Sequence, residues 1–346
     1  MLLSLRNALD EGAPISLSNH RPCRHRSVGV PVKQHSLHLK DLRPKSHFQA
    51  SMEPQPLKFP AGVHIRKDVY PTIDPTQTFA AQSYSGKVVL VTGASGGLGA
   101  KTAQFYARAG ASVALVARNK EKIQDVIDGV PGAKDRMIAL SADVTDFHAA
   151  DAAVKQTVEK FGRLDILVAN AGVMTSYTKT ILEKDPDVYW RTFEVNVKGV
   201  FTFIRAALPE LQKANGQVIA VSAGLAYMNV PNNSDYAISK LAVNRLVEFI
   251  PLEFPSVSAI AVHPGVVKTN MTTTVELPDS LPAAKEPYDT PELPAATILY
   301  LTLGQGVEWL NGRYYSANWD IGDVEKLWKE KIVAGNALVT QLAVPM

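Results

Sequence analysis

The stretch "KVVLVTGASGGLGAKTAQFYARAG", residues 87–110, decides the fold of this chain. It begins with an apolar run, turns through Gly93, Gly97 and Gly99, and continues with helical spacing from about 98 to 109. Glycines between a strand and a helix allow a tight turn and close approach of a pyrophosphate, which N–H groups at the helix start can bind. The stretch predicts a phosphate-binding βα unit, although a Gly-rich turn in an unrelated α/β fold would look the same.

Six further apolar runs follow, separated by segments with helical spacing. Because these runs are apolar throughout, they predict parallel strands that helices cover on both faces. The expected strands are 87–94, 112–117, 137–144, 164–172, 216–223, 257–265 and 312–320, and the expected helices are 98–109, 147–161, 186–213 and 234–250. The sequence therefore predicts an α/β fold with a doubly wound, seven-stranded parallel sheet.

Composition and charge exclude several classes of function. The 346 residues carry a net charge of +3, and residues 1–51 hold eight Lys and Arg against three Asp and Glu. The remainder is close to neutral and gives no electrostatic support for a nucleic-acid partner. Cys23 is the only cysteine, which excludes an intrachain disulfide and fits a reducing compartment, for which we expect the cytoplasm. No apolar run approaches the roughly 20 residues that a membrane helix needs.

Three segments differ in composition from the strand–helix alternation. Residues 1–52 are basic and rich in His, Pro and Ser, so we expect a disordered, dispensable extension. The alternatives are a functional tail, a mitochondrial presequence, or an upstream addition before a start at Met52. The His spacings are irregular, so no metal site is expected. Pro-rich residues 53–85 predict an irregular arm on a single catalytic domain, 86–346, in which residues 271–293 predict a substrate lid.

Six short motifs recur in order along residues 86–322. They are "TGASGGLG" (92–99), "ADV" (142–144), "ANAG" (169–172), "NVKG" (196–199), "YAISK" (236–240) and "HPGVVKT" (263–269). Each is weak alone, but the ordered set resembles the short-chain dehydrogenase/reductase family. The resemblance implies a Rossmann-type sheet, a nicotinamide cofactor and assembly as a homodimer or homotetramer. The chain is also similar to fungal members of the family, many of which serve specialised-metabolite pathways.

The end of the second expected strand indicates which nicotinamide cofactor binds. An acid there would hydrogen-bond the ribose 2′-hydroxyl and repel a 2′-phosphate, but this chain has Ala117 followed by Arg118. A guanidinium suits a phosphate, and Ser95 in the glycine turn could add a hydrogen bond. The sequence thus favours NADP(H) over NAD(H), although Arg118 could also merely begin an exposed helix.

The resemblance extends the cofactor contacts to further positions, each of which has a structural alternative. Asp143 matches the family's adenine-contacting acid, or belongs to a helix cap. Asn170 and Gly172 match the segment that shapes the cofactor site, or pack at a strand end. Thr269 matches a residue near the nicotinamide carboxamide, or is an ordinary loop threonine. The expected cofactor-binding set is Thr92, Gly93, Ser95, Gly97, Leu98, Gly99, Arg118, Asp143, Val144, Asn170, Ala171, Gly172, Tyr236, Lys240, Val267 and Thr269.

Tyr236 and Lys240 stand four residues apart, so they share one face of the expected helix 234–250. A tyrosine with an ordinary pKa of about 10 is a sluggish acid–base group at neutral pH. A nearby ammonium and a positively charged nicotinamide would lower that pKa by stabilising tyrosinate. The resemblance implies that Tyr236 gives the proton and that Asn196 holds a water linking Lys240 to solvent. His263 is expected to be strand-end structure.

The place of the catalytic serine departs from the family pattern. The family's serine lies thirteen residues before the tyrosine, where this chain has Ala223; Ser222 stands one residue earlier and is the candidate for that role. Neighbouring strand residues point to opposite faces, so Ser222 would face away from the cleft unless a bulge, made easier by Gly224, turned it inward. Losing one such donor typically costs about 10²–10³ in rate, not all activity.

These residues predict an NADP(H)-dependent oxidoreductase that interconverts a carbonyl and a secondary alcohol. The Leu, Val and Pro content of residues 271–293 indicates a small, fairly apolar substrate. The first alternative is an NADP-binding scaffold or regulator whose catalysis is impaired because Ala223 occupies the serine place. The second alternative is an isomerase or epimerase built on the same fold.

Overall fold

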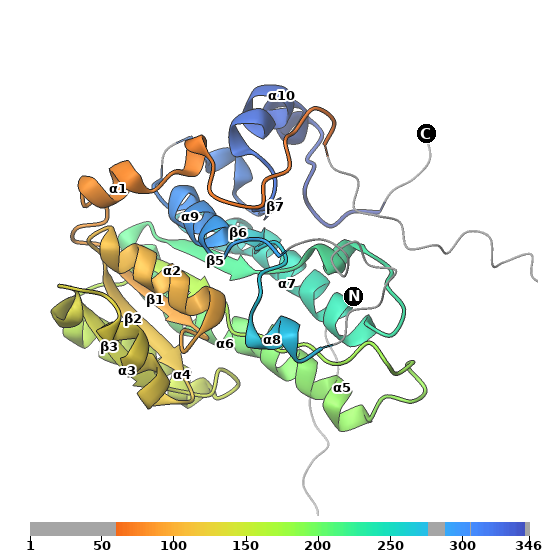
Figure 1. The fold of residues 1–346 in the computed structure, drawn as a ribbon, viewed down its shortest axis with the longest axis horizontal. Helices are drawn as coiled ribbons and strands as arrows, with labels where there is room; N and C mark the ends of the chain where they lie inside the picture. The colour runs from red at the N-terminus through yellow and green to blue at the C-terminus, as the bar shows by residue number, and fades with distance from the viewer. Residues whose placement is uncertain (1–59, 276–287, 305, 343–346) are drawn as a thin grey trace, which may run out of the picture. The chain divides into compact units, whose positions relative to one another are not determined.

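The computed structural model describes residues 60–275, 288–304 and 306–342, built around one parallel sheet. The strand order is β3-β2-β1-β4-β5-β6-β7 (Figure 1). The strands are β1 (Val88–Thr92), β2 (Ser112–Ala117), β3 (Met137–Ser141), β4 (Ile166–Ala169), β5 (Gln217–Val221), β6 (Ser258–His263) and β7 (Arg313–Ser316). The predicted Rossmann-type, seven-stranded parallel sheet is confirmed. The expected extension 1–52, the start of the expected arm and most of the expected lid lie outside the described residues.

The strand order reverses between β1 and β4, which are hydrogen-bonded neighbours. Val91 pairs with Leu115 of β2 on one side and with Val168 of β4 on the other. The connections from β1 and from β4 therefore leave the sheet in opposite directions. Ligands of open parallel sheets bind outside the carboxyl ends of the strands at such a reversal.

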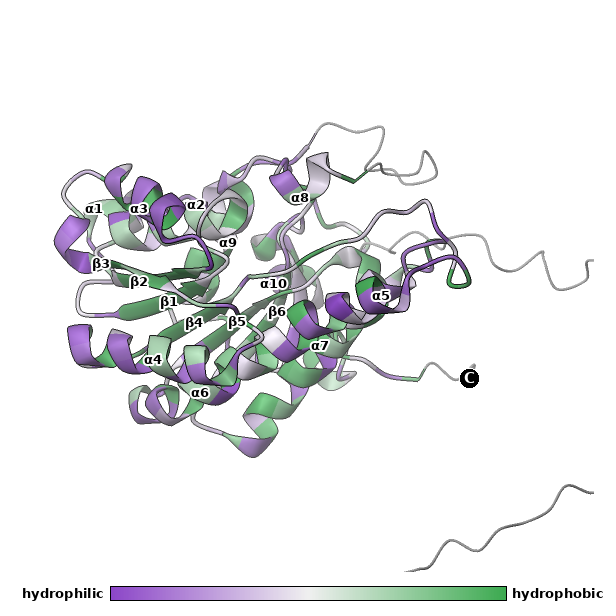
Figure 2. Cartoon of the chain, turned by 90° about the horizontal axis from the view of Figure 1, so that it is seen from below, coloured by the Kyte–Doolittle hydropathy of each residue, from purple (hydrophilic) through white to green (hydrophobic). Residues whose placement is uncertain are grey.

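Helices cover both faces of the sheet because alternate strand residues bury apolar side chains in two separate cores. Val89 and Val91 belong to one core, and Val88 and Leu90 belong to the other. The first core is covered by α2 (Gly97–Arg108), α3 (Lys120–Asp128), α9 (Glu292–Leu301) and α10 (Ile321–Ala334), and the second by α4 (Phe147–Phe161), α6 (Gly199–Ala214) and α7 (Ser234–Glu253) (Figure 2). None of the helices in the described part of the chain has the length and apolar character needed to cross a membrane.

The helix expected over 186–213 is divided in the structure. It consists of α5 (Pro186–Phe193), a π-helical turn (Glu194–Lys198) and α6. The π turn carries Asn196, whose side chain hydrogen-bonds the backbone of Val173. The wide turn occupies only five residues between two α-helical stretches, so the sequence predicted one continuous helix. The remaining short helices are Pro71–Ile73, α1 (Thr76–Ala80), Lys134–Arg136, Gly224–Tyr227, α8 (Asn270–Thr273) and Glu308–Leu310.

Residues 60–85 contribute to the core although they hold only short helical turns. Tyr70, Ile73 and Tyr84 are buried among residues of the first core. The Tyr84 hydroxyl donates to the carbonyl of Leu299 at 2.5 Å, and the Tyr70 hydroxyl donates to the carbonyl of Trp319 at 3.1 Å. The segment before β1 is thereby bonded to the end of α9 and to the loop after β7.

Candidate active site

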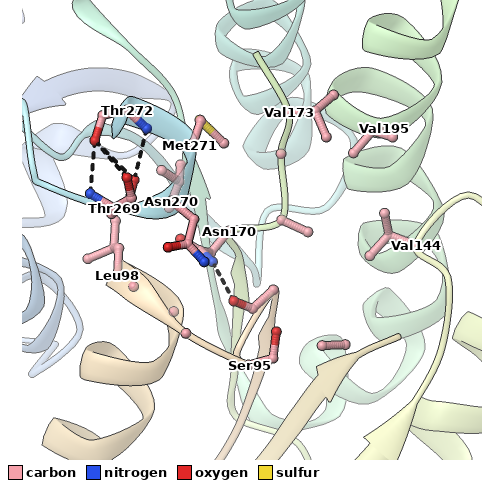
Figure 3. A pocket seen from close by; sticks show the side chains of 18 of the residues that line it. Ser95, Leu98, Val144, Asn170, Val173, Val195, Thr269, Asn270, Met271 and Thr272 are labelled. Atoms are coloured by element: carbon pink, nitrogen blue, oxygen red, sulfur yellow. Dashed lines mark hydrogen bonds between the residues drawn. The ribbon is translucent and has the colours of Figure 1, made fainter. Parts of the chain in front are cut away.

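A cavity of about 910 Å³ opens at the carboxyl ends of the strands, at the reversal between β1 and β4 (Figure 3). Every predicted cofactor-binding residue except Thr92 lines it, and so does Ser222. Thr92 and Asn196 are buried behind its wall. The cavity is also lined by residues outside the predicted cofactor-binding set, which are Gly96, Ala117, Asn119, Lys122, Ala142, Val173, Arg191, Val195, Val221, Pro264, Gly265, Lys268, Asn270 and, from the predicted lid, Met271, Thr272 and Thr273.

The glycine turn approaches the loop after β4 too closely for side chains. A Cβ atom on Gly99 would lie 2.4 Å from the carbonyl oxygen of Gly93 and 2.5 Å from Nδ2 of Asn170. Gly93 and Gly97 also have positive φ angles, of 68° and 54°. Glycine adopts both features without strain, which explains its presence at all three positions.

Thr92 and Asn170 join the ends of β1 and β4. The Thr92 Oγ1 accepts hydrogen bonds from the backbone N–H groups of Asn170 at 3.0 Å and Ala171 at 3.1 Å. The Asn170 Nδ2 donates to the Thr92 carbonyl at 2.9 Å. Thr92 therefore shapes the cavity from behind, by holding its two central loops together.

Two basic side chains line the end of the cavity beyond β2. Arg118 follows the strand, and Lys122 lies one turn further along, at the start of α3. Between them Asn119 caps α3, because its Oδ1 accepts from the Lys122 N–H at 2.8 Å. Lys122 stands four residues after Arg118, and this spacing could have predicted that a second basic side chain lies beside Arg118. Neighbouring cations at this end suit a phosphate group.

Asp143 closes its own turn and contacts a cation across the cavity. Its Oδ1 accepts from the N–H of Thr145 at 2.9 Å and from its hydroxyl at 2.8 Å, and these bonds, the backbone one above all, lower the pKa of Asp143. Its Oδ2 lies 3.4 Å from Nη2 of Arg191 on α5. Asp146, not Asp143, caps α4. Asp143 is therefore not the residue that caps α4, which was the structural alternative to a role in cofactor binding.

Tyr236 and Lys240 occupy one face of α7, as predicted, and both are almost fully buried. The Lys240 Nζ donates to the carbonyl of Val221 at the end of β5, at 2.8 Å. Burial lowers the pKa of Lys240 to about 8 and raises the pKa of Tyr236 above its ordinary value. In the protein alone, desolvation thus outweighs the lowering of the tyrosine pKa that a neighbouring ammonium would cause.

Asn196 lies behind Lys240. Its Oδ1 accepts from the Val173 N–H at 2.8 Å, and its Nδ2 donates to the Val173 carbonyl at 2.9 Å and to Ser239 Oγ at 3.0 Å. A Cβ on Gly172 would lie 3.2 Å from Asn196 Oδ1 and 3.4 Å from Lys240 Nζ. The absence of a side chain at 172 therefore lets the amide and the ammonium approach the same point.

Ser222 does not occupy a bulge. Its N–H donates to the Val262 carbonyl at 2.8 Å, which continues the register in which Val221 pairs with Val262. Its hydroxyl donates to the Lys240 carbonyl at 3.4 Å and therefore faces α7. Regular pairing with β6 therefore extends past Val221 without a bulge, and Ser222 still lines the cavity. Ala223 is extended and buried, and no hydroxyl stands in its place.

His263 is the last residue of β6, at the strand end where the sequence placed it. Its ring lies beside Gly224, where a Cβ would be 3.3 Å from Nε2. Burial lowers the pKa of His263 to about 4, so the ring is neutral at pH 7. Its Nδ1 has no hydrogen-bond partner within the described ranges.

The far wall of the cavity is a short helix in the region where the sequence predicted a lid. Thr269 caps α8 through reciprocal hydrogen bonds with Thr272 (Figure 3). Asn270, Met271 and Thr273 of this helix also line the cavity. A four-residue helix is too short to produce a periodic signal, so the sequence could not reveal it. Within the described ranges no cluster of His, Cys, Asp or Glu could hold a metal ion.

A family model described as short chain dehydrogenase matches residues 87–279. The short chain dehydrogenases mpl6 of Monascus purpureus and citE of Monascus ruber are each 39% identical to this chain over 284 residues. Those matches cover 80% of this chain and 94% of each relative. The short chain dehydrogenase pigC of Monascus ruber is 34% identical, over 79% of this chain and 91% of its own length.

Solved structures of short chain dehydrogenases and related enzymes are also similar to this chain. The crystal structure of the KRED1-Pglu enzyme is 34% identical, with a TM-score of 0.61 over 66% of this chain and 100% of that one. A short chain dehydrogenase from Burkholderia cenocepacia J2315 in complex with NADP is 30% identical, with a TM-score of 0.59 over 68% of this chain and 97% of that one.

The close approach at Gly99 predicts that Gly99→Ala weakens cofactor binding. Because the new Cβ must displace the Gly93 carbonyl or the Asn170 amide, we expect the Kd for the reduced nicotinamide cofactor to rise at least about tenfold, measured by fluorescence titration. Gly129→Ala is the control, since its Cβ would make only ordinary contacts at the end of α3. Equal affinity in Gly99→Ala and wild type would contradict this view of the turn.

Proposed function

The chain belongs to the short-chain dehydrogenase family, and from that premise we propose that it is an NADP(H)-dependent oxidoreductase that interconverts a ketone or aldehyde and an alcohol. Oxidoreductases of this family act between CH–OH and C=O groups. The observation that carries the proposal is that Tyr236 and Lys240 meet the glycine turn and the loop after β4 around a single cavity. The share of each Monascus relative that is covered, 94%, supports a shared reaction class.

The residues of the cavity suit proton transfer to a developing alkoxide. A nicotinamide cofactor supplies hydride chemistry when bound. Tyr236 holds its proton at neutral pH, but burial raises its pKa, so donation to the substrate oxygen requires the ammonium of Lys240 to lower that pKa. Lys240, with a pKa of about 8, is mainly an ammonium at pH 7 and would stabilise the tyrosinate that remains. Asn196 would hold the backbone of Val173 beside that lysine.

The preference for NADP(H) rests on the charge beyond β2. Arg118 and Lys122 both line the cavity there, and Asn119 between them is neutral. Two cations favour a 2′-phosphate, and Ala117 at the end of β2 has no carboxylate to repel it. The Burkholderia relative in complex with NADP supports the same preference.

The proposed substrate is a small, fairly apolar molecule. Apolar side chains from three loops form a small cluster on the α7 side, consisting of Met174, Tyr177, Leu225, Met228, Val230 and Val275. These loops follow β4, β5 and α8 and so flank the carboxyl ends of the strands. Met side chains adapt to ligands of irregular shape. A role in fungal specialised metabolism is part of the proposal and rests on the family resemblance.

We also propose that the protein forms a homodimer or homotetramer. Apolar side chains are exposed on α6 and α7, with Phe201 43%, Ile238 48%, Phe249 42% and Leu252 75% exposed. Exposed apolar side chains in such numbers suit a subunit contact.

The alternative function, an NADP-binding scaffold or regulator, is favoured by one observation. Ala223 provides no hydroxyl at the serine place, and the Ser222 hydroxyl faces α7. An isomerase would give no net NADP⁺, so cofactor oxidation separates it from the reductase.

Tyr236→Phe tests the proposed reaction. With a panel of ketones and aldehydes, we expect wild-type protein to oxidise NADPH stoichiometrically and Tyr236→Phe to lose about 10²–10⁴ in kcat, because the proton donor is gone. The NADPH affinity of the variant should stay close to that of wild type, which separates loss of chemistry from loss of binding. Tight NADPH binding by wild type with no turnover on any compound would favour the scaffold.

Arg118→Glu tests the cofactor preference. The new carboxylate would repel a 2′-phosphate and accept from a 2′-hydroxyl, so the ratio of kcat/KM for NADPH over NADH should fall by about 10²-fold or more. Lys120→Glu makes a similar change of charge on the exposed side of α3, outside the cavity, and should leave the ratio within about threefold. A ratio that changes equally in both variants would refute a phosphate site at Arg118.

Ser222→Ala and Ala223→Ser together test the serine place. Since the Ser222 hydroxyl bonds the Lys240 carbonyl, we expect Ser222→Ala to leave kcat within about threefold. Ala223→Ser adds a donor at the family's position and should raise kcat by about tenfold or more. A loss of about 10² in Ser222→Ala, without a change in thermal stability, would make Ser222 the catalytic serine after all.

A further inference from the structure

A buried ion pair lies directly beside the proposed catalytic tyrosine. The ammonium of Lys184 contacts the carboxylate of Asp235, the residue before Tyr236. Thr175 joins both, because its hydroxyl donates to Asp235 Oδ2 at 2.5 Å and accepts from Lys184 Nζ at 3.1 Å. The side chains of Lys184 and Asp235 are only 7% and 0% exposed. The pair is thus removed from water.

Burial of this pair is not explained by stability alone. The loss of hydration on burying two charges offsets much of their attraction, and apolar residues of similar volume are often as stable. A hydrogen-bonded ion pair does differ from an apolar contact in fixing the direction and distance of its partners.

The pair connects two segments that flank the cavity. Lys184 and Thr175 belong to residues 173–185, between β4 and α5, which contain turns but no helix or strand. Asp235 belongs to the first turn of α7, where a carboxylate also suits the helix dipole. Residues 173–185 begin with Val173, a lining residue of the cavity.

Further links run in parallel to the ion pair, and one of them is Asn196, which bonds both Val173 and Ser239 of α7. Tyr177 packs against Val230 in the apolar cluster, and its carbonyl accepts from Asn232 Nδ2 at 2.8 Å. Both lie between the loop 173–185 and the segment that leads into α7. The ion pair is the link that reaches the residue next to Tyr236, so it can transmit the position of the loop to the tyrosine.

We infer that Lys184 and Asp235 are positioning residues that hold the loop 173–185 against the first turn of α7, and thereby fix Tyr236 relative to the substrate side of the cavity. The inference rests on the proposed function, and neither residue touches the reacting atoms. A displacement of about 1 Å at a catalytic group can cost about 10² in rate, so the loss of such a link is measurable.

The experiment compares Lys184→Met, Asp235→Asn and the double variant Lys184→Met/Asp235→Asn. Each single variant leaves one buried charge unpaired and should lower both stability and activity. The double variant leaves no unpaired charge, so we expect its thermal midpoint to return toward that of wild type. Its kcat should nevertheless stay about 10- to 100-fold below wild type, and its KM for the best ketone or aldehyde of the panel should rise.

Lys87→Met is the control for removing a lysine from another ion pair, one in which Asp165 keeps Arg163 as a second partner. Lys87 Nζ lies 3.0 Å from Oδ1 of Asp165, another buried carboxylate, but this pair is at the start of β1, away from the cavity. The control should leave kcat and KM unchanged. If the double variant recovers kcat together with its thermal midpoint, the pair has only a structural role and the inference is wrong.

Hydrogen exchange of residues 173–185 with NADPH bound gives a second readout that does not depend on turnover. We expect exchange at least about tenfold faster in the double variant and unchanged in Lys87→Met. If wild type reduces no carbonyl, the proposed function fails while this readout still decides the inference. Unchanged exchange of 173–185 in the double variant would overturn it.

Discussion

The hydrogen bonds between Thr92 and the backbone of Asn170 and Ala171 are the constraint on which the rest of the structure depends. They join the ends of β1 and β4, the two strands between which the sheet reverses its order. With these ends fixed, the glycine turn can lie so close to Asn170 that no Cβ fits at Gly99. The cavity opens at this junction.

The sheet was predictable because each strand is apolar throughout, and two covered faces demand that composition. The strand boundaries were less predictable. Within the expected strand 164–172 only Ile166–Ala169 is a strand, because Asn170 and the residues after it leave the sheet and form part of the cavity wall. Helices α9 and α10 were not expected. The contact of Asn196 with Val173 was not predictable, because the two residues are 23 positions apart in the sequence.

In the site too, features set by neighbouring residues were predictable from the sequence, and contacts between distant residues were not. The glycine turn and the pair Tyr236 and Lys240 could be recognised because their residues lie close together in the sequence. The structure brings both to one cavity. Arg191 lines the cavity through the fold alone, 48 residues from the Asp143 that it contacts. Lys184 and Asp235 are likewise 51 residues apart, and the sequence around neither residue predicts their contact. The direction of the Ser222 hydroxyl depended on strand register, which a sequence leaves open.

The bonds of Tyr70 and Tyr84 also bear on the order in which the chain can acquire its structure. These tyrosines bond Trp319 and Leu299, which are 249 and 215 residues away. A ribosome makes the tyrosines first and these two hydrogen-bond partners last, so both bonds form only near the end of synthesis. Contacts of such sequence separation also slow folding, because a long loop must close before they form. Completion of the native state is thereby coupled to the end of synthesis, and the interval is the period in which a chaperone would matter most.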